Sequence, residues 1–131
     1  MPQLTCIVVT PEMTALEEPT DFVALPLYDG ELGIAPGHSP MIGRLGFGEM
    51  RLRDGSKTSR YYLDGGFVQV SDNVISVLTR RAIPADQLDA EAARNQLQQA
   101  LRQQAYSPEL MEIRDRAVDQ ARAQIRMTRS V

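Results

Sequence analysis

The sequence predicts an α+β fold in which a β-sheet domain, residues 1–84, precedes a helical region, residues 85–131. Three observations lead to this prediction. All nine glycines lie before Pro84, and beyond it Pro108 is the only residue of either turn-forming kind. Valine and isoleucine are frequent in the first region, whereas alanine, glutamine and arginine dominate the second. Short β-branched runs separated by frequent turn formers are typical of an antiparallel sandwich or barrel.

The strands of the first region are predicted from apolar runs that end at turn-forming residues. Hairpin turns are expected at Asp54-Gly55 and at 71–73, and Asp29-Gly30 is expected to close the apolar run before it. Gly65-Gly66 is expected to break the chain, and Glu17-Glu18 to lie in a polar connection. About 84 residues can bury a modest core, so this region can fold by itself. The predicted strands are 4–9, 22–27, 49–53, 60–63, 67–70 and 74–78.

A first helix is predicted directly after Pro84. Asp86 is its expected N-cap, and apolar residues follow at helical spacing from Leu88 to Leu101. Because alanine supplies much of the apolar stripes of this region, each helix buries little area, and we expect the helical region to be weakly held. A fixed helical appendage is the alternative.

A second helix is predicted after Ser107, an N-cap residue that precedes Pro108 at the first helical position. The short connection between the two helices predicts an antiparallel hairpin. The residues expected to form its buried stripe are Leu110, Ala117, Ala121 and Ile125.

Composition excludes several classes of protein. The net charge of −3 disfavours a nucleic-acid partner. No apolar run approaches the roughly 20 residues of a membrane-spanning helix, so no direct membrane insertion is expected. Residues 1–10 lack the features of a signal peptide, which points to the bacterial cytoplasm. Cys6 is the only cysteine and lies in an apolar run, so we expect a buried, inert thiol.

The sequence offers no motif for catalysis. No Lys-Ser/Thr pair follows Gly37, so the glycine-bearing segment before it is not a phosphate-binding loop. One histidine and one cysteine cannot build a zinc site alone, and neither a metal nor a cofactor is expected. His38 lies in a loop bounded by proline and glycine, where a structural role is expected. A Ser-His-Asp arrangement around it stays open, although no nucleophile-elbow motif is present.

The segment Gly30–Pro40 is the most distinctive part of the chain. Three glycines and two prolines are expected to fix a compact loop that holds Glu31 and Leu32. A rigid, exposed loop with one acid and apolar neighbours suits docking of a partner. A tight corner between sandwich strands would require the same glycines for its backbone angles alone.

This segment resembles the epsilon subunits of bacterial F-type ATP synthases, in which Gly-Glu-Leu-Gly-Ile-x-Pro-Gly-His-x-Pro recurs. Three further segments agree. Val8–Pro11 resembles the first strand and turn of that family, and Gly48–Arg53 resembles its Pro-Gly-x-x-Arg-Ile region. Gly65–Val70 resembles Ser-Gly-Gly-Phe-x-Glu-Val, with Asp64 in place of the usual serine. The resemblance extends over essentially the whole chain, and its helical tail is the least specific part.

The resemblance implies a sandwich of about ten strands followed by a C-terminal two-helix antiparallel hairpin. It also implies a non-catalytic rotor subunit of the proton-translocating ATP synthase. The implied partners are the gamma subunit, the c-ring and the alpha/beta catalytic head. The hairpin of such subunits can extend along gamma and oppose ATP hydrolysis. The implied location is peripheral, on the cytoplasmic side of the bacterial inner membrane.

The resemblance assigns contact residues in the β-sheet domain. Glu31 matches the acid that faces the polar loops of the c-ring. The residues assigned with it to contacts with the c-ring and gamma are Asp29, Leu32, His38 and Ser39.

Three arginines near the end of the chain form a second candidate site. Arg122, Arg126 and Arg129 follow at spacings of four and three, which places them on one face of a helix. The resemblance assigns them to contacts with the catalytic head. The alternative is that these arginines only stabilise the helix, because positive charges near a helix C-terminus interact favourably with the helix dipole.

Some members of the family bind ATP through an Ile/Leu-Asp-x-x-Arg-Ala motif in the first helix and arginines in the second. Here Ala92 occupies the position of the motif arginine, so one charge-assisted contact is missing. We therefore expect ATP binding by the tail to be weak or absent. The residues that do match this site are Leu88, Asp89, Ala93, Arg122 and Arg126.

Two other functions compete with a rotor subunit. One is a stand-alone module that senses a nucleotide with its tail. The other is a small β-sandwich hydrolase that uses His38.

Overall fold

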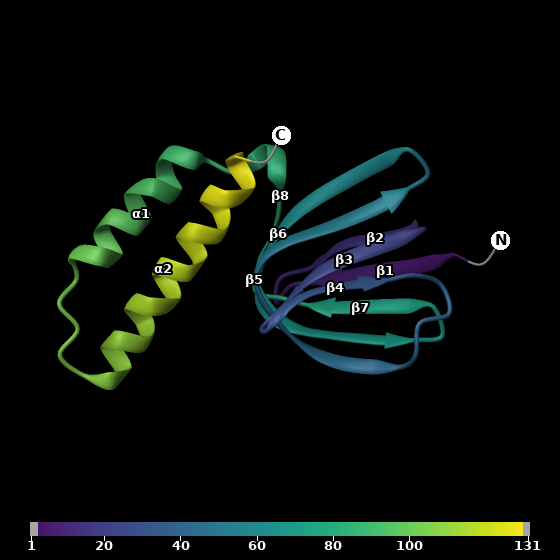
Figure 1. Ribbon diagram of the computed structural model, residues 1–131, viewed down its shortest axis with the longest axis horizontal. Coiled ribbons are helices and arrows are strands. Elements are labelled where there is room, and N and C mark those ends of the chain that lie inside the picture. The colour runs from purple at the N-terminus through teal and green to yellow at the C-terminus, as the bar shows by residue number, and fades with distance from the viewer. Residues whose placement is uncertain (1–2, 130–131) are drawn as a thin grey trace. The chain divides into compact units, whose positions relative to one another are not determined.

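The computed structural model describes residues 3–129 and confirms the predicted α+β fold. The chain divides into two compact units, Met1–Pro84 and Ala85–Val131. The first unit contains the strands and the second contains the helices (Figure 1). The strands are β1 (Leu4–Val9), β2 (Thr14–Thr20), β3 (Phe22–Leu27), β4 (Gly30–Ile34), β5 (Met41–Asp54), β6 (Lys57–Ser71), β7 (Val74–Leu78) and β8 (Ala82–Pro84). The helices are the 3₁₀ turn η1 (Ala85–Gln87), α1 (Ala90–Arg102) and α2 (Pro108–Arg129).

The strands form one folded sheet in the order β2-β1-β7-β6-β5-β3-β4, with β8 also paired to β6. Strands β5 and β6 are long and take part in both layers of the sandwich. Residues 41–45 of β5 pair with residues 66–70 of β6, and residues 47–54 pair with residues 57–64. Strands β1 and β7 run parallel, so the sandwich that was predicted as antiparallel contains one parallel pair.

Alternating apolar residues fill the space between the two layers. Leu4, Cys6 and Val8 of β1 are fully buried, and Ile75 and Val77 of β7 pack with them. This period of two is the pattern expected of strands with one face on a core. Burial, followed by the nearby Glu18 carboxylate, raises the pKa of the Cys6 thiol to about 12. The prediction that Cys6 is buried is confirmed.

Glycines at the bend of β5 and β6 let these strands pass from one layer to the other. Gly66 has a φ of +111°, and a Cβ built there would meet the Leu78 carbonyl oxygen at 1.8 Å. On β5, a Cβ at Gly46 would meet the Leu27 carbonyl oxygen at 3.0 Å. The prediction that Gly65-Gly66 breaks the chain is wrong, because β6 continues through both residues. Glycine permits the bend without ending the strand.

Two other strand predictions need correction. The polar connection expected around Glu17-Glu18 is strand β2, an edge strand paired to β1 alone within the sheet order. The described residues form eight strands where about ten were expected. The lower number arises because β5 and β6 are each one long strand, whereas glycines inside them suggest a strand end in the sequence.

The first helix begins later than predicted. Asp86 lies in η1, and the N-cap of α1 is Asp89. The Asp89 carboxylate accepts hydrogen bonds from the backbone N–H groups of Glu91 at 3.0 Å and Ala92 at 3.1 Å. This side chain therefore satisfies donors that every helix leaves unpaired at its start.

The second helix begins as predicted, because the Leu110 N–H donates to Ser107 Oγ at 3.2 Å. Gln96 links α1 to α2, because its Nε2 donates to the carbonyl oxygen of Ala117 at 3.2 Å. Ala121 is buried as expected, but Leu110 is 49% exposed. The Leu110 prediction is wrong because α1 ends at Arg102, before it reaches the level of Leu110.

Candidate partner interface

Strand β4 positions the acidic candidate Glu31. The strand pairs with β3 so that Glu31 lies opposite Pro26 and Leu32 lies opposite Leu25. The prediction that a compact loop holds these residues is therefore wrong. Strand alternation makes the Glu31 side chain exposed and packs Leu32 partly against the core. Glu31 is available to a partner, and Leu32 supports the strand from inside.

The predicted contact residues fall into two groups at opposite ends of β4. Asp29 lies exposed in the turn before the strand, two residues before Glu31. His38 and Ser39 follow the strand, and Ser39 is exposed while His38 is half-buried. A five-residue strand spans about 16 Å, so these ends do not form one compact cluster.

Backbone contacts hold His38 in its turn. The Gly37 N–H donates to Asn73 Oδ1 at 2.7 Å, and the His38 N–H donates to the carbonyl oxygen of Ala35 at 3.2 Å. The ring Nδ1 donates to the carbonyl oxygen of Ser39 at 2.7 Å. A catalytic Ser-His-Asp arrangement would place a carboxylate at this nitrogen. The geometry gives His38 a structural role in the turn.

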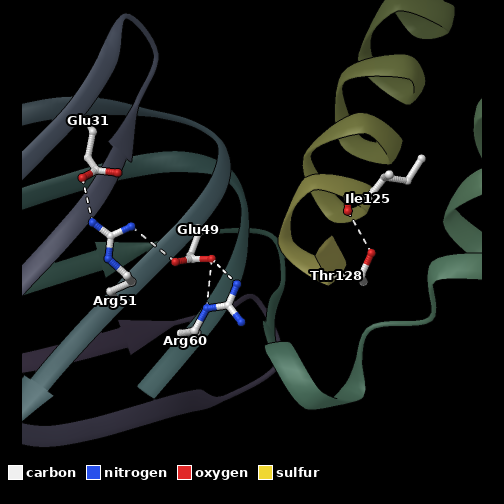
Figure 2. A network of polar contacts seen from close by, with 6 residues as sticks. All are labelled: Glu31, Glu49, Arg51, Arg60, Ile125 and Thr128. Carbon is white, nitrogen blue, oxygen red and sulfur yellow. Dashed lines mark hydrogen bonds and ion pairs between the residues drawn. The ribbon is translucent and has the colours of Figure 1, made fainter. Parts of the chain in front are cut away.

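Four alternating charges form a ladder across the outer surface of the sheet (Figure 2). Arg51 Nη2 lies 2.8 Å from Glu31 Oε1, and Arg51 Nη1 lies 3.3 Å from Glu49 Oε1. Glu49 Oε2 accepts from Arg60 Nη2 at 2.5 Å and from Arg60 Nε at 3.1 Å. Sequence reasoning missed this ladder, which we call the charge ladder, because its residues come from β4, β5 and β6.

The charge ladder keeps Glu49 and Arg51 charged. Burial raises the pKa of Glu49, but hydrogen bonds and charges from Arg60 and then Arg51 outweigh it, and the net pKa lies below the ordinary value. The hydrogen bond to Glu31, opposed by burial, raises the pKa of Arg51. Both shifts favour the ionised forms that make the contacts.

A row of exposed side chains crosses the other outer surface of the sandwich. Arg44 of β5 lies opposite Phe67 of β6, which lies opposite Leu78 of β7, which lies opposite Val9 of β1. We call these four residues the outer row. Phe67 is 58% exposed and Leu78 is 54% exposed. The Arg44 guanidinium stacks over the exposed ring of Tyr28 at 4.4 Å and extends the row.

A shallow hollow adjoins the outer row. It has a volume of about 310 Å³ and is lined by residues 9–11, Gly66 and residues 78–80. An exposed apolar patch next to a hollow is a common feature of protein–protein contact sites. Sequence reasoning missed this surface, although the alternation of Phe67 with Val68 in a strand could have placed Phe67 on the outside.

The helical unit contains the remaining predicted site residues. Arg122, Arg126 and Arg129 are exposed along α2, at the spacing predicted for one helix face. Among the residues that match the ATP motif, Asp89 caps α1 and Ala93 is buried. Leu88 is half-buried, and Ala92 is exposed at the position of the motif arginine.

Between residues 3 and 129, no group of three or more His, Cys, Asp or Glu side chains is placed to hold a metal ion. Over the same range, no helix combines the length and the apolar character needed to cross a membrane.

Comparisons with known proteins agree over both units of the chain. Residues 3–85 match the β-sandwich domain of the ATP synthase delta/epsilon chain. The ATP synthase epsilon chain of Rhodopirellula baltica is 52% identical over 96% of this chain and 98% of its own length. The ATP synthase epsilon chain of Nitratidesulfovibrio vulgaris strain DP4 is 34% identical over 95% of this chain and 87% of its own length.

Solved structures share the fold. A chain of the Euglena gracilis mitochondrial ATP synthase aligns with a TM-score of 0.85 at 23% identity, covering 94% of this chain and 80% of that one. A chain from the central stalk and c-ring of the Tetrahymena thermophila mitochondrial enzyme aligns with a TM-score of 0.77 at 14% identity, covering 97% of both chains. These structures support the fold, and the sequence matches extend over the sandwich and the helices. The chain therefore belongs to the family of ATP synthase epsilon chains.

Proposed function

We propose that this chain is a non-catalytic rotor subunit of the central stalk of a proton-translocating F-type ATP synthase. It couples rotation of the c-ring to the catalytic head, and it lies peripherally on the cytoplasmic side of the bacterial inner membrane. The outer row supports this proposal most strongly. Phe67 and Leu78 are exposed side by side, and a contiguous exposed apolar patch is typical of a surface that binds another protein. In this proposal the β-sandwich, residues 1–84, docks to the stalk, and the helical unit, residues 85–131, regulates ATP hydrolysis.

The outer row is the proposed docking surface for the gamma subunit. Phe67 and Leu78 provide an apolar centre, and the hollow beside them accepts an apolar side chain of gamma. Arg44 and Arg80 stand at the margins of this surface, where they attract acidic side chains of the partner.

The two ends of β4 are the proposed contacts with the c-ring and the lower part of gamma. Asp29 and Glu31 present carboxylates at one end, and His38 and Ser39 lie at the other. Because strand β4 separates these groups, they contact different loops of the partners rather than one. Leu32 contributes by packing β4 against the core.

The helical unit is the proposed regulator of hydrolysis. Arg122, Arg126 and Arg129 present positive charge along α2 and suit acidic surfaces of the alpha/beta catalytic head. The buried residues of α1 are two alanines, Ala93 and Ala100, so α1 contributes little apolar area to its contact with α2. A helix pair held this weakly can change its arrangement at low cost.

Removal of residues 85–131 is expected to leave a folded sandwich that still joins the complex. The core of Met1–Pro84 is supplied by strands alone, and the cut after Pro84 keeps β8 paired to β6. ATP hydrolysis by the complex should rise several-fold if the helices oppose it. Size-exclusion chromatography with gamma and a hydrolysis assay measure the two effects. An unfolded fragment, or a folded one that leaves hydrolysis unchanged, would contradict the division of roles.

The isolated chain is expected to bind ATP weakly or not at all, and Ala92→Arg should raise its affinity at least about tenfold. The substitution restores the motif arginine at an exposed helical position, and a hydrogen bond to a charged group contributes about 1.5–3 kcal/mol. Calorimetric titration with ATP measures both affinities, and Ala92→Gln is the control of similar size without charge. Micromolar affinity of the unmodified chain would favour the nucleotide-sensing alternative.

A further inference from the structure

We propose that Arg51 is a positioning residue for Glu31 and fixes this carboxylate for its contact with a partner. The proposal rests on the proposed function, in which Glu31 faces the polar loops of the c-ring. Arg51 Nη2 lies 2.8 Å from Glu31 Oε1, although 20 positions separate the residues in the sequence. The two side chains come from β4 and β5, which are not neighbours in the sheet, because β3 lies between them.

The ion pair crosses β3 at a small residue. Ala24 of β3 pairs with Gly33 on one side and with Arg51 on the other. Its side chain is 1% exposed, and its strand neighbours Val23 and Leu25 belong to the core cluster, so strand alternation directs Ala24 to the opposite, outer surface. A larger side chain at this position would stand between Glu31 and Arg51.

Arg51 is itself held from the opposite side. Its Nη1 lies 3.3 Å from Glu49, which is only 17% exposed at the side chain. Glu49 in turn accepts two hydrogen bonds from Arg60 (Figure 2). A guanidinium that contacts carboxylates at both Nη atoms has its plane and position fixed, because its donors form a rigid fork.

This arrangement places Glu31 at the exposed end of the charge ladder. Glu31 is 56% exposed at the side chain, the highest value among the four residues of the charge ladder. The contact with Arg51 uses Oε1, which leaves Oε2 for a donor of the partner. The chemistry that fits is a hydrogen-bond donor or a cation on a polar loop. Ordering Glu31 before docking reduces the conformational entropy that binding would otherwise lose.

The test uses the intact ATP synthase in inverted membrane vesicles, with ATP-driven proton pumping measured per ATP hydrolysed. Arg51→Gln should lower this ratio about two- to fivefold, as expected for loss of one exposed ion pair. Arg51→Lys should restore only part of it, because an ammonium cannot contact both carboxylates through a fork. Arg53→Gln is the matched control on the same strand, since Arg53 lies over the Phe22 ring at 5.0 Å.

A double variant separates positioning from direct contact. If Arg51 acts through Glu31, Glu31→Ala combined with Arg51→Gln should pump as Glu31→Ala alone does. A double variant that is worse than Glu31→Ala would overturn the proposal, because Arg51 would then act independently. Normal pumping by Arg51→Gln beside impaired pumping by Glu31→Ala would overturn it as well.

A measurement on the purified full chain decides the positioning separately from the proposed function. In nitrogen NMR spectra, the Arg51 guanidinium should rotate slowly, and Glu31→Ala should accelerate its rotation. Equal rotation rates in both proteins would overturn the positioning. Glu31→Ala could pump normally while the Arg51 guanidinium rotates slowly in the unmodified chain and faster in Glu31→Ala. That result would refute the c-ring contact and leave the positioning intact. If Arg51→Gln fails to fold, Glu49→Gln loosens the same guanidinium and should give a smaller loss of pumping.

Discussion

Replacement of Phe67 by glutamate is expected to lower the affinity of the chain for the gamma subunit at least about 30-fold. Phe67 is the exposed aromatic residue of the outer row, and an aromatic anchor at the centre of an interface contributes about 2 kcal/mol or more. The new carboxylate would also have to lose water at the centre of the interface, which costs free energy. Titration of purified gamma with the variant chain measures the change in affinity.

Gln69→Glu is the matched control for this change. Gln69 is exposed on the same strand and the same face, two residues along, and the substitution also adds one negative charge. The control should bind within about threefold of the unmodified chain, because surface substitutions away from an anchor change free energies by about 0.5 kcal/mol. Equal losses in both variants would indicate a general charge effect, and no loss in either would refute docking at the outer row.

Gly66→Ala is expected to destabilise the β-sandwich by about 3 kcal/mol or more, since its Cβ would overlap backbone that cannot move aside. The overlap is with the Leu78 carbonyl oxygen at 1.8 Å and Thr79 Cα at 3.0 Å, and the φ of +111° already disfavours any side chain. For a domain of this size, 3 kcal/mol lowers the melting temperature by about 12–24 °C. Differential scanning calorimetry measures the shift.

Gly55→Ala is the control that distinguishes steric overlap of the new Cβ from strain of the backbone conformation. Gly55 also has a positive φ, +63°, but a Cβ there would have no atom within 4 Å. This control should lose only about 1–2 kcal/mol from the left-handed conformation. If the two variants melt at the same temperature, the close approach of β6 to β7 at Gly66 does not determine stability.

The parts of the fold that follow from local pattern could be predicted from the sequence. Strands Leu4–Val9 and Val74–Leu78 have the predicted bounds, because each alternates buried and exposed residues between clear turn formers. Strand Thr14–Thr20 was missed because it is a polar edge strand, and its residues need little burial. The bend at Gly66 was predicted as a strand end because glycine is compatible with either a bend or an end. The close approach of β7, which the sequence does not show, distinguishes the two.

The candidate site shows the same division between local and long-range information. Glu31 was found as an acid in a distinctive segment, but its strand and its partner Arg51 were not. The ion pair depends on the sheet order, which brings β4 and β5 to either side of a small residue on β3. In the helical unit, Asp86 and Asp89 are both suitable N-caps, and the 3₁₀ turn after Pro84 determines that Asp89 is used.

The central claim is that this chain couples the c-ring to the catalytic head. Its most direct test is ATP-driven proton pumping by inverted vesicles whose ATP synthase has been stripped of the chain. Addition of the purified chain should restore the number of protons pumped per ATP hydrolysed, and the Phe67→Glu variant should not. Stripped vesicles that already pump with full efficiency, or ATP hydrolysis by the purified chain alone, would contradict the account.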